Sequence, residues 1–545
     1  MKNLWQALMM VRRCDPASFW RRLLYVLLQS LLPLANLYIL KLLVDSVTLA
    51  VQGSGAATDC LPWLLAMVAV FLCNRIVVAL SAVNNDVLGQ RLVDYMSDLM
   101  QQQAATLDLA YYDTPSYHDT LHRAQQEAGS RPVAILNSFM ALFGAIVSIV
   151  GVVALLVSAS WWVVAVMLVA VVPSFAVRLY KARCLYRFRR DNTQHYRRTA
   201  YYSHLLTSRA AAQEMRTFGL APYFRRLFVS ARRTLVSHLL DISRRLGTAD
   251  IFCAVVEAAA MLAVVWLLIS QAVAAAISIG SFVMLFEAFR RGQNYLASLV
   301  AAIAGLYDNR LFVSNLFEFL NLKPSILSPA NPLPMPEKIE RVEFRDITFR
   351  YPDMQRDVLS HFNLSATVGN VTSIKGCNGF GKSTLIKLLL RLYDPQQGAV
   401  FINGVDIRRF DLADLRSRMG VLFQDFMRYC CTAAENITFG ASLQSSFHPT
   451  LATLERAASL AGADEVVAHL GRGFGTQLGR LFDGGAELSM GQWQRIALAR
   501  ALYSDAPLLL LDEPTAWLDT DARNHFYDTI EQIKTDKIIL LITHS

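Results

Sequence analysis

Cysteine is scarce and scattered in this chain. Its 545 residues include eight cysteines, of which only Cys430 and Cys431 are adjacent, and no C-x-x-C pair occurs. A disulfide framework or a zinc site needs several cysteines at short, regular spacings. The sequence therefore predicts structural thiols and argues against a disulfide-stapled or zinc-bound fold.

Charge is also scarce. Only 17% of the residues are charged, 54% are hydrophobic, and the mean hydropathy is +0.33. A soluble protein of this size carries more charge and less apolar surface. The apolar residues are concentrated before residue 310, so the N-terminal part is expected to lie in a membrane.

Three long regions lack basic residues. Pro132–Val177 contains no charged residue, Gly247–Phe289 and Leu42–Asn74 contain no Lys or Arg, and the uncharged Leu23–Leu40 comes just before the last of these. Each region can hold two membrane spans of about 20 residues with a short turn between them. The sequence predicts six transmembrane helices, near residues 22–48, 61–84, 133–157, 161–185, 248–271 and 276–300.

The basic residues set the expected orientation. Arginines precede the first and fifth predicted spans, basic residues follow the fourth, and the three short outer turns carry no Lys or Arg. By the positive-inside rule, the N-terminus, the long loops and the C-terminal region are cytoplasmic. The net charge of +9 needs no nucleic-acid partner, because the arginines border membrane spans and form no groove. No cleavable signal peptide is expected, since the first span is full length.

A glycine loop marks the C-terminal region. Residues 376–384 read Gly-Cys-Asn-Gly-Phe-Gly-Lys-Ser-Thr and fit the pattern G-x-x-x-x-G-K-[ST] between an apolar strand and a helix. Such a loop cradles phosphates with its backbone N–H groups. Lys382 would contact the β- and γ-phosphates, and the Ser383 hydroxyl would bind Mg²⁺. The predicted nucleotide-binding residues of this loop are Gly376, Cys377, Asn378, Gly379, Phe380, Gly381, Lys382, Ser383 and Thr384.

A second motif ends in two carboxylates. Leu508–Leu511 is fully apolar, as expected of a buried strand, and Asp512-Glu513 follows it. Asp512 is predicted to bind Mg²⁺, and Glu513 to orient and deprotonate the water that attacks ATP. The sequence thus predicts ATP and Mg²⁺ as cofactors and ATP hydrolysis as the activity.

Between these motifs, residues 488–492 read Leu-Ser-Met-Gly-Gln. With them the chain resembles the ATP-binding-cassette (ABC) superfamily over essentially its whole length. The resemblance implies an α-helical membrane domain of six transmembrane helices with long cytoplasmic extensions, joined to an α/β P-loop ATPase domain. It also implies that Ser489, Gly491 and Gln492 cap the γ-phosphate of ATP held by another subunit.

The same resemblance assigns four further residues. Tyr351 is similar to the aromatic that stacks on adenine, and Gln424 to the residue that reaches toward Mg²⁺ and the membrane domain. Asp519 is similar to the aspartate of the D-loop, and His544 to the histidine that senses the γ-phosphate. Glu513, His544 and Gln424 are the implied catalytic group, and Ser383, Gln424 and Asp512 the implied metal ligands.

Three features depart from the family pattern. Phe380 replaces a small residue, so its ring is expected to point away from the phosphates, and Met490 replaces the first glycine of the signature. The chain stops at Ser545, directly after the histidine, where members of the family continue. A truncated sequence is therefore expected, because the last strand would otherwise have little cover.

The predicted domains are a transmembrane domain over residues 1–320, a proline-rich linker over 321–338 and an ATPase domain over 339–545. Five prolines within residues 321–337 rule out a helix there. The two long cytoplasmic loops, residues 86–131 and 178–245, are expected to form helices with breaks at Tyr111–Tyr117 and Gln213–Leu220. These breaks resemble the coupling helices of ABC exporters.

The resulting interpretation is ATP-driven export of a hydrophobic or amphipathic substrate, a peptide, lipid or drug-like molecule, by a dimer with alternating access. The partner is a second copy or a homologous half-transporter, and the membrane is the bacterial inner membrane. A heterodimer subunit or a nucleotide-gated channel is the alternative. Among exporters, the chain most resembles bacterial half-transporters that export peptides, drugs or similar hydrophobic products. Glu287, Arg290 and Arg291 fall deep in the sixth span, where they either pair with one another or line a cargo cavity.

Overall fold

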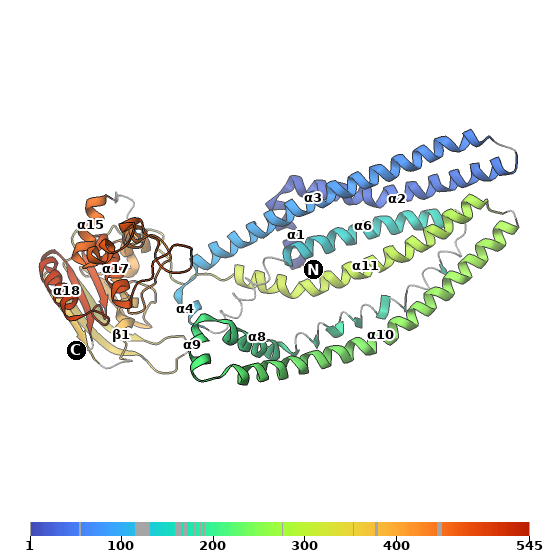
Figure 1. The fold of residues 1–545 in the computed structure, drawn as a ribbon. Helices are drawn as coiled ribbons and strands as arrows, with labels where there is room; N and C mark the ends of the chain where they lie inside the picture. Colours follow the sequence, from blue (N-terminus) through green and yellow to red (C-terminus); the bar gives the residue numbers. More distant parts are fainter. Residues whose placement is uncertain are drawn as a thin grey trace. The chain divides into compact units, whose positions relative to one another are not determined.

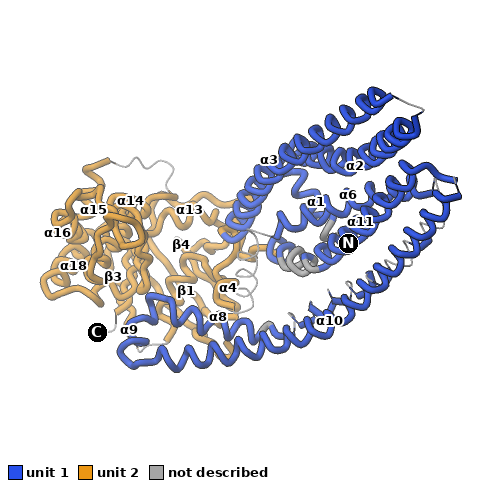
Figure 2. The backbone as a smooth tube through the Cα atoms, turned by 45° about the vertical axis from the view of Figure 1, so that its right-hand side comes forward, with its two compact units in different colours: residues 1–104, 120–321 blue, residues 105–119, 322–545 orange. Residues whose placement is uncertain are grey.

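The structure is a computed structural model. It describes residues 2–53, 56–114, 131–157, 191–274, 276–352, 354–376, 380–443 and 450–543, with short helical pieces between residues 165 and 188. The chain forms two compact units, which Figure 2 shows in blue and orange. The first contains residues 1–104 and 120–321, and the second contains residues 105–119 and 322–545. The predicted linker begins where the first unit ends, and the predicted domain limits stay predictions.

The first unit is helical (Figure 1). Its helices are α1 (Lys2–Cys14), α2 (Pro16–Val51), α3 (Leu61–Thr106), α6 (Arg131–Val157), α8 (Thr193–Thr207), α9 (Arg209–Thr217), α10 (Ala221–Val273) and α11 (Ile279–Leu320). Helix α9 ends at Thr217, and Gly219, two residues later, has a φ of 63° that few other residues adopt, so the expected break in the second long loop is confirmed.

Four of the described helices, α2, α3, α6 and α10, are long and apolar enough to cross a membrane. They contain the predicted spans 22–48, 61–84, 133–157 and 248–271. The sixth predicted span coincides with α11 from residue 279 onward, but α11 carries Glu287, Arg290 and Arg291 and is not among the four. Most of the fourth predicted span, 161–185, lies outside the described residues, so the count of six stays a prediction.

Helices α2, α6 and α11 pack against one another in the first unit. Leu37, Val152, Leu285 and Phe289 are almost fully buried in one apolar cluster with residues of α10. Glycine permits the close approach of α6 to α2, because a Cβ atom at Gly151 would lie 2.1 Å from the Leu34 side chain. Gly151 therefore leaves room for the Leu34 side chain between the two helices.

The second unit contains two four-stranded sheets. The first has the order β2 (Leu359–Thr367), β1 (Arg341–Phe349), β4 (Gln397–Ile402), β5 (Val405–Asp406), and its strands are antiparallel. The second has the order β3 (Val371–Lys375), β8 (Ile538–Thr543), β7 (Leu508–Asp512), β6 (Met419–Leu422), and its strands are parallel. Its helices are α4 (Leu109–Tyr112), α12 (Lys382–Leu389), α13 (Leu412–Ser417), α14 (Ala433–Thr438), α15 (Leu451–Leu460), α16 (Ala463–Ala468), α17 (Met490–Tyr503) and α18 (Thr520–Ile533).

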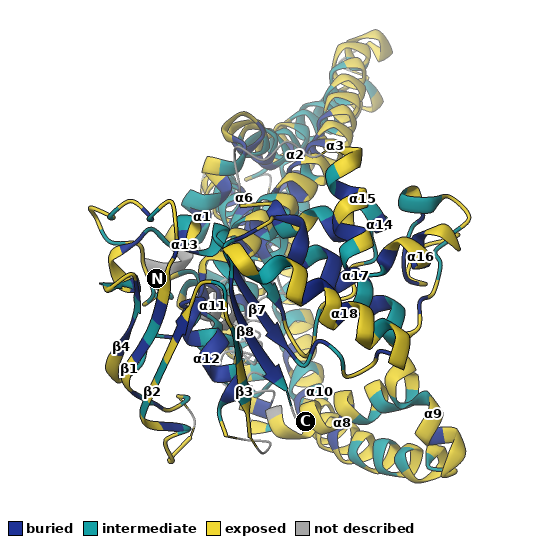
Figure 3. Cartoon of the chain, turned by 90° about the vertical axis from the view of Figure 1, so that its left-hand side faces the viewer, coloured by how far each residue is buried: buried dark blue, intermediate teal, exposed yellow. Residues whose placement is uncertain are grey.

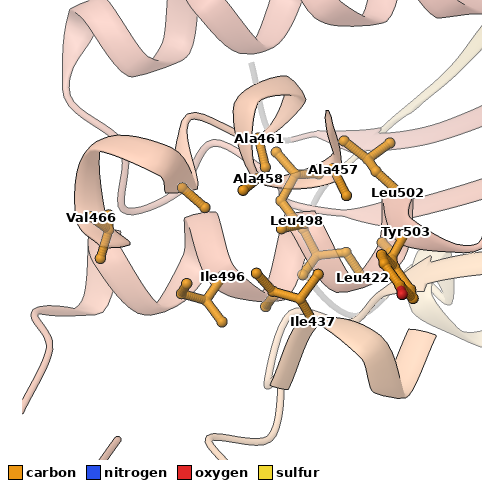
Figure 4. Packing of buried hydrophobic residues seen from close by; sticks show 14 of the residues in the cluster. Leu422, Ile437, Ala457, Ala458, Ala461, Val466, Ile496, Leu498, Leu502 and Tyr503 are labelled. Carbon is orange, nitrogen blue, oxygen red and sulfur yellow. The ribbon is translucent and has the colours of Figure 1, made fainter. Parts of the chain in front are cut away.

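The two central strands of the parallel sheet, β7 and β8, are buried on both faces, as Figure 3 shows. Leu508 and Leu510 of β7 face a core shared with α12 and the antiparallel sheet, whereas Leu509 and Leu511 face a core shared with α14–α18. Figure 4 shows part of this second core, where Leu422 of β6 packs near residues of α17. A strand with two buried faces needs an uninterrupted apolar run, which is why residues 508–511 are all leucine.

Candidate functional site

The carboxyl ends of four parallel strands meet at one edge of the second sheet. Lys375 is paired with Thr543, Ile542 with Asp512, and Leu511 with Leu422. The glycine loop after β3, the carboxylates at the end of β7 and Gln424 after β6 therefore leave the sheet at the same level. Ligands of open α/β sheets bind at this edge, beyond the carboxyl ends of the strands.

Gly381 begins helix α12 in a left-handed conformation, with φ at 77° and ψ at 16°. A Cβ atom there would lie 2.8 Å from the Val358 side chain, so both the turn and the packing call for glycine. Lys382 is almost buried, and its ammonium group donates a hydrogen bond to the Gly376 carbonyl across the loop. This bond ties Lys382 to the residue at which the loop begins, and Lys382 lies at the N-terminal end of an eight-residue helix, where anions are favoured.

Thr384 and Tyr351 lie in contact on the helix side of the loop. The Tyr351 hydroxyl lies 3.0 Å from Thr384 Oγ1, and Thr384 is only 4% exposed. Ser383, the predicted metal ligand, is half-buried beside them. The structure therefore brings the predicted adenine-stacking residue next to the glycine loop, although the two are 33 residues apart in sequence.

The two carboxylates after β7 differ in environment. Asp512 is 3% exposed at the end of the strand, and Glu513 is half-buried. Glu513 adopts a φ of 51°, an uncommon value for a residue with a side chain, and its N–H donates to the Ile542 carbonyl at 3.0 Å. This turn takes the chain out of the sheet directly after Asp512, so the Glu513 side chain starts at the same edge.

Gln424 is exposed in the turn that follows β6. A residue that the sequence reasoning did not single out holds the next segment in place. Arg500 of α17 donates to the Met427 carbonyl at 3.1 Å and to both oxygens of Asn436, and its guanidinium lies 4.8 Å from the centre of the Tyr429 ring. Burial lowers the pKa of Arg500 from its ordinary value. The residues after Gln424 are therefore tied to α17.

The signature residues cap the start of α17. Ser489 accepts a hydrogen bond from the Gln492 N–H, and Gln492 Oε1 accepts one from the Ser489 N–H at 2.9 Å. Both side chains thus satisfy backbone groups of the first turn. Met490 is 38% exposed at the first position of the helix. Phe380 of the glycine loop is 71% exposed, as expected of a ring that points away from the loop.

Ser489, Gly491, Gln492 and Asp519 line a pocket of about 500 Å³ with Arg495 and Trp517. Arg495 joins this pocket to the start of α18, because its guanidinium lies 2.7 Å from Glu465 and 3.5 Å from Asp519. Asp519 caps α18 by accepting from the Ala522 N–H at 2.8 Å. The residues that line this pocket include none of the glycine loop and neither Asp512 nor Glu513. The described site residues therefore form two separate groups.

Gln494 connects the signature helix to Glu513. It is 2% exposed; its Nε2 donates to the Glu513 carbonyl at 3.0 Å, and its Oε1 accepts from the Trp517 N–H at 3.0 Å. The sequence motifs give Gln494 no role. A polar residue in the otherwise apolar buried part of α17 was the signal that could have identified it.

Four predicted site residues, Cys377, Asn378, Gly379 and His544, lie outside the described residues. Among the described site residues, the types of oxygen atom they offer indicate whether they suit Mg²⁺. Ser383, Gln424 and Asp512 supply only hydroxyl, amide and carboxylate oxygens, which suit Mg²⁺ when phosphate oxygens complete the shell. In the described part of the chain, no three His, Cys, Asp or Glu residues cluster as a metal site. The residues present fit a cation held jointly with a nucleotide.

The charged residues of α11 pair with one another. Glu287 accepts two hydrogen bonds from Arg290, at 2.6 and 2.8 Å, and one from Arg291 at 3.3 Å. Arg291 also donates to the Pro33 carbonyl of α2 at 3.3 Å. Of the two readings of these residues, the structure shows the mutual pairing.

Comparison with known proteins places both parts of the chain. Residues 23–291 match the family model "ABC transporter transmembrane region", and residues 359–516 match the model "ABC transporter". The subtilin transport ATP-binding protein SpaT of Bacillus subtilis is 28% identical over 100% of this chain and 88% of its own. The nisin transport ATP-binding protein NisT of Lactococcus lactis subsp. lactis is 26% identical over 95% of this chain and 85% of its own.

A solved structure supports the fold. The structure of a bacterial Atm1-family ABC exporter with ATP bound superimposes with a TM-score of 0.77 at 21% identity, covering 97% of this chain and 92% of that chain. The two family models together match more than three quarters of the sequence, and they follow each other in one chain. The chain therefore belongs to the ABC transporters, as an exporter in which the transmembrane region and the ATPase are fused.

Proposed function

We propose that this exporter works as a dimer that moves amphipathic peptides out of the cell and hydrolyses ATP at sites shared between two ATPase domains. Its membership of the family makes it a multi-pass membrane protein with a cytoplasmic ATPase, and ATP hydrolysis drives its export of substrate.

One observation carries the proposed ATP site: the glycine loop, Asp512, Glu513 and Gln424 all leave the same edge of one parallel sheet. In this arrangement Lys382 meets the β- and γ-phosphates, and the backbone at the start of α12 holds the remaining phosphate oxygens. The Tyr351 ring stacks on the adenine base. No other group of described residues combines a phosphate-binding loop with buried carboxylates.

When bound, Mg²⁺ would neutralise charge on the phosphates, with Ser383, Asp512 and Gln424 as its protein-side oxygens. Glu513 starts at the same edge and is the nearest carboxylate in sequence to Asp512. We assign it to the water that attacks the γ-phosphate, whose proton it accepts. The bond from Gln494 to the Glu513 carbonyl fixes the backbone from which this carboxylate extends.

The dimer follows from the separation of the two groups. The signature residues line a pocket of their own, apart from the glycine loop of the same domain. The N-terminal end of α17 favours an anion. A second ATPase domain facing the first head to tail would place that end against the γ-phosphate, so each site would need two subunits. A second copy of this chain can supply the partner domain, because the chain carries both the glycine-loop group and the signature group.

The cargo class rests on the relatives. SpaT and NisT carry subtilin and nisin in their names, and both match the chain from the membrane region to the ATPase. Similarity over the whole membrane region, where cargo passes, supports a peptide cargo for this chain. A homologous half-transporter as partner is the alternative to a homodimer.

The test is ATP hydrolysis by the purified protein in lipid vesicles, with and without nisin as a probe peptide. Glu513→Gln should lower the rate by about 10²–10⁴-fold, the contribution of a general base, while ATP binding persists. Glu455→Gln, on the exposed face of α15, is the matched control and should hydrolyse ATP normally. An unaffected rate in Glu513→Gln would overturn the catalytic assignment. Uptake of labelled nisin into inverted vesicles tests the cargo, and its absence would remove peptides of that kind from the proposal.

A further inference from the structure

Three aromatic rings form a cluster beside the glycine loop. The ring centre of Tyr351 lies 4.9 Å from that of Phe349 and 5.3 Å from that of Tyr393, and both pairs meet edge to face. Tyr393 also contacts Phe349, at 5.6 Å, and is 4% exposed. Edge-to-face pairs resist rotation of the rings. Tyr351 is therefore held from two sides before any nucleotide arrives.

Both tyrosine hydroxyls in this cluster have polar partners. Tyr351 meets Thr384 of the glycine loop at 3.0 Å, and Tyr393 donates a hydrogen bond to the Asp113 carboxylate. Burial, with the hydrogen bond to the Asp113 carboxylate, raises the pKa of Tyr393 above its ordinary value. Lys387 lies over both rings, 5.2 Å from the centre of Tyr351 and 6.0 Å from that of Tyr393. If these two rings served packing alone, phenylalanine would be sufficient at both positions.

Asp113 comes from the segment that follows α3 in the chain. Leu109 and Ala110 of this segment pack against the core of the second unit. Asp108 anchors it independently of Tyr393, because its carboxylate accepts from Ser325 N at 2.5 Å and from Ser325 Oγ at 2.6 Å. Loss of the bond between Tyr393 and Asp113 therefore does not release the segment.

We propose that Tyr393 is a positioning residue of the ATP site. Asp113 holds Tyr393, Tyr393 holds the Tyr351 ring, and Tyr351 contacts the Thr384 hydroxyl; we call this series of contacts the relay. The chain runs directly from the membrane-spanning helix α3 into this segment, so the relay links a cytoplasmic loop to the adenine side of the site. This link is separate from Gln424. The inference rests on the proposed ATP site, and it adds a residue that contacts no part of the nucleotide itself.

The relay acts through preorganisation. A tyrosine ring already held in place loses less freedom when a base stacks on it, so ATP binds more tightly. Tyr393 touches none of the reacting atoms, and its loss should therefore raise the KM for ATP while leaving kcat almost unchanged. A general loosening of the fold would instead lower kcat and thermal stability together.

The test uses the full-length protein in lipid vesicles and measures kcat, KM for ATP, and the equilibrium binding of a fluorescent ATP analogue. Tyr393→Leu should raise KM about fivefold, the effect of losing an edge-to-face contact. Tyr393→Phe keeps the ring but loses the bond to Asp113, so it should raise KM less, about threefold. Phe410→Leu, equally buried in the same core, is the matched control and should leave KM unchanged.

A double-mutant cycle tests the link to the loop segment. Asp113→Ala and Tyr393→Phe should each raise KM about threefold, and the double variant should be no worse than either, because both remove one interaction. Asp113→Ala combined with Phe410→Leu should behave additively. Additive effects of Asp113→Ala and Tyr393→Phe would overturn the relay.

Two other outcomes would count against the relay. An equal rise of KM in Phe410→Leu would show that the core, not Tyr393, sets the affinity, and an unchanged KM in Tyr393→Leu would remove its role. If Tyr393→Leu does not fold, Tyr393→Phe and Asp113→Ala decide through the cycle. Lys382→Met separates this result from the proposed function: if it still binds the ATP analogue, the ATP site itself is misassigned.

Discussion

Gly491 lies against the backbone of Trp517, so that a Cβ atom at residue 491 would meet the Trp517 carbonyl oxygen at 2.6 Å. The glycine of the signature is thus required by a close approach between α17 and the turn before α18. Gln494 joins the same two segments by its bonds to Glu513 and Trp517. Any residue larger than glycine at this position must push the two segments apart.

Gly491→Ala should therefore reduce ATP hydrolysis strongly and lower the thermal stability by an overpacking cost of about 1–3 kcal/mol. Binding of a fluorescent ATP analogue to the glycine loop should persist, since that loop belongs to the other group. Gly471→Ala is the control, because no atom lies within 4 Å of a Cβ atom at residue 471. Normal turnover in Gly491→Ala would show that the turn can move without loss of activity.

Tyr351→Ala should weaken ATP binding by about 1–3 kcal/mol, the scale of base stacking on an aromatic side chain. Tyr351→Phe keeps the ring and loses only the bond to Thr384, so a much smaller loss is expected. Equilibrium binding of the ATP analogue measures both, with Tyr527→Ala on the exposed face of α18 as control. Equal losses in Tyr351→Ala and Tyr351→Phe would assign the hydroxyl, rather than the ring, to the nucleotide.

Glu287→Gln should reduce the amount of protein inserted in the membrane and its melting temperature, because Arg290 and Arg291 lose their shared partner. The double variant Glu287→Gln with Arg290→Gln removes one charge of each sign and should recover part of the loss. Membrane yield and thermal unfolding in detergent measure both. If Glu287→Gln instead keeps full stability and changes which peptides stimulate ATP hydrolysis, these residues face the cargo.

Asp411 should make the stability of the ATPase unit depend on pH in acid solution. The hydrogen bond from Ser328 of the linker, with those from the first turn of α13, lowers the pKa of Asp411. A lowered pKa in the folded state means that the stabilisation is present above the unfolded pKa of about 3.9 and is lost as the pH falls through the folded value.

Thermal unfolding of the full chain in detergent, from pH 7 down to pH 3, should therefore show a steeper acid loss for the native protein than for Asp411→Asn. Asp528→Asn on the exposed face of α18 serves as the control and should follow the native protein. Identical acid profiles for the native protein and Asp411→Asn would mean that the link to Ser328 does not contribute.

Much of the fold was predictable from local patterns. Long apolar runs with few or no basic residues located α2, α3, α6 and α10, because a membrane span has a length that composition alone reveals. The motif around Lys382 located a strand, a loop and a helix, since glycines at fixed spacing have few structural uses. The apolar run before Asp512 likewise located β7.

The contacts that complete the site were not predictable, because they join residues distant in sequence. Tyr393 and Asp113 are 280 residues apart, and although Asp113 falls in the predicted break Tyr111–Tyr117, no sequence pattern pairs it with Tyr393. The contacts that hold the described residues 105–114 to the ATPase unit include the one between Asp108 and Ser325, which are 217 residues apart. A single sequence shows periodicity and motifs, whereas pairing between distant segments needs the fold.

The ion pairs of Glu287 with Arg290 and Arg291 in α11 affect how this helix can be inserted into the membrane. Helix α10 ends at Val273 and α11 begins at Ile279, so the two are joined by a short turn. Taken alone, the first half of α11 carries three charges and is a poor candidate for entry into lipid. Pairing within the helix reduces that cost, and the apolar α10 that precedes it reduces it further. The predicted sixth span would therefore enter the bilayer as the second arm of a hairpin with α10, which precedes it in the chain.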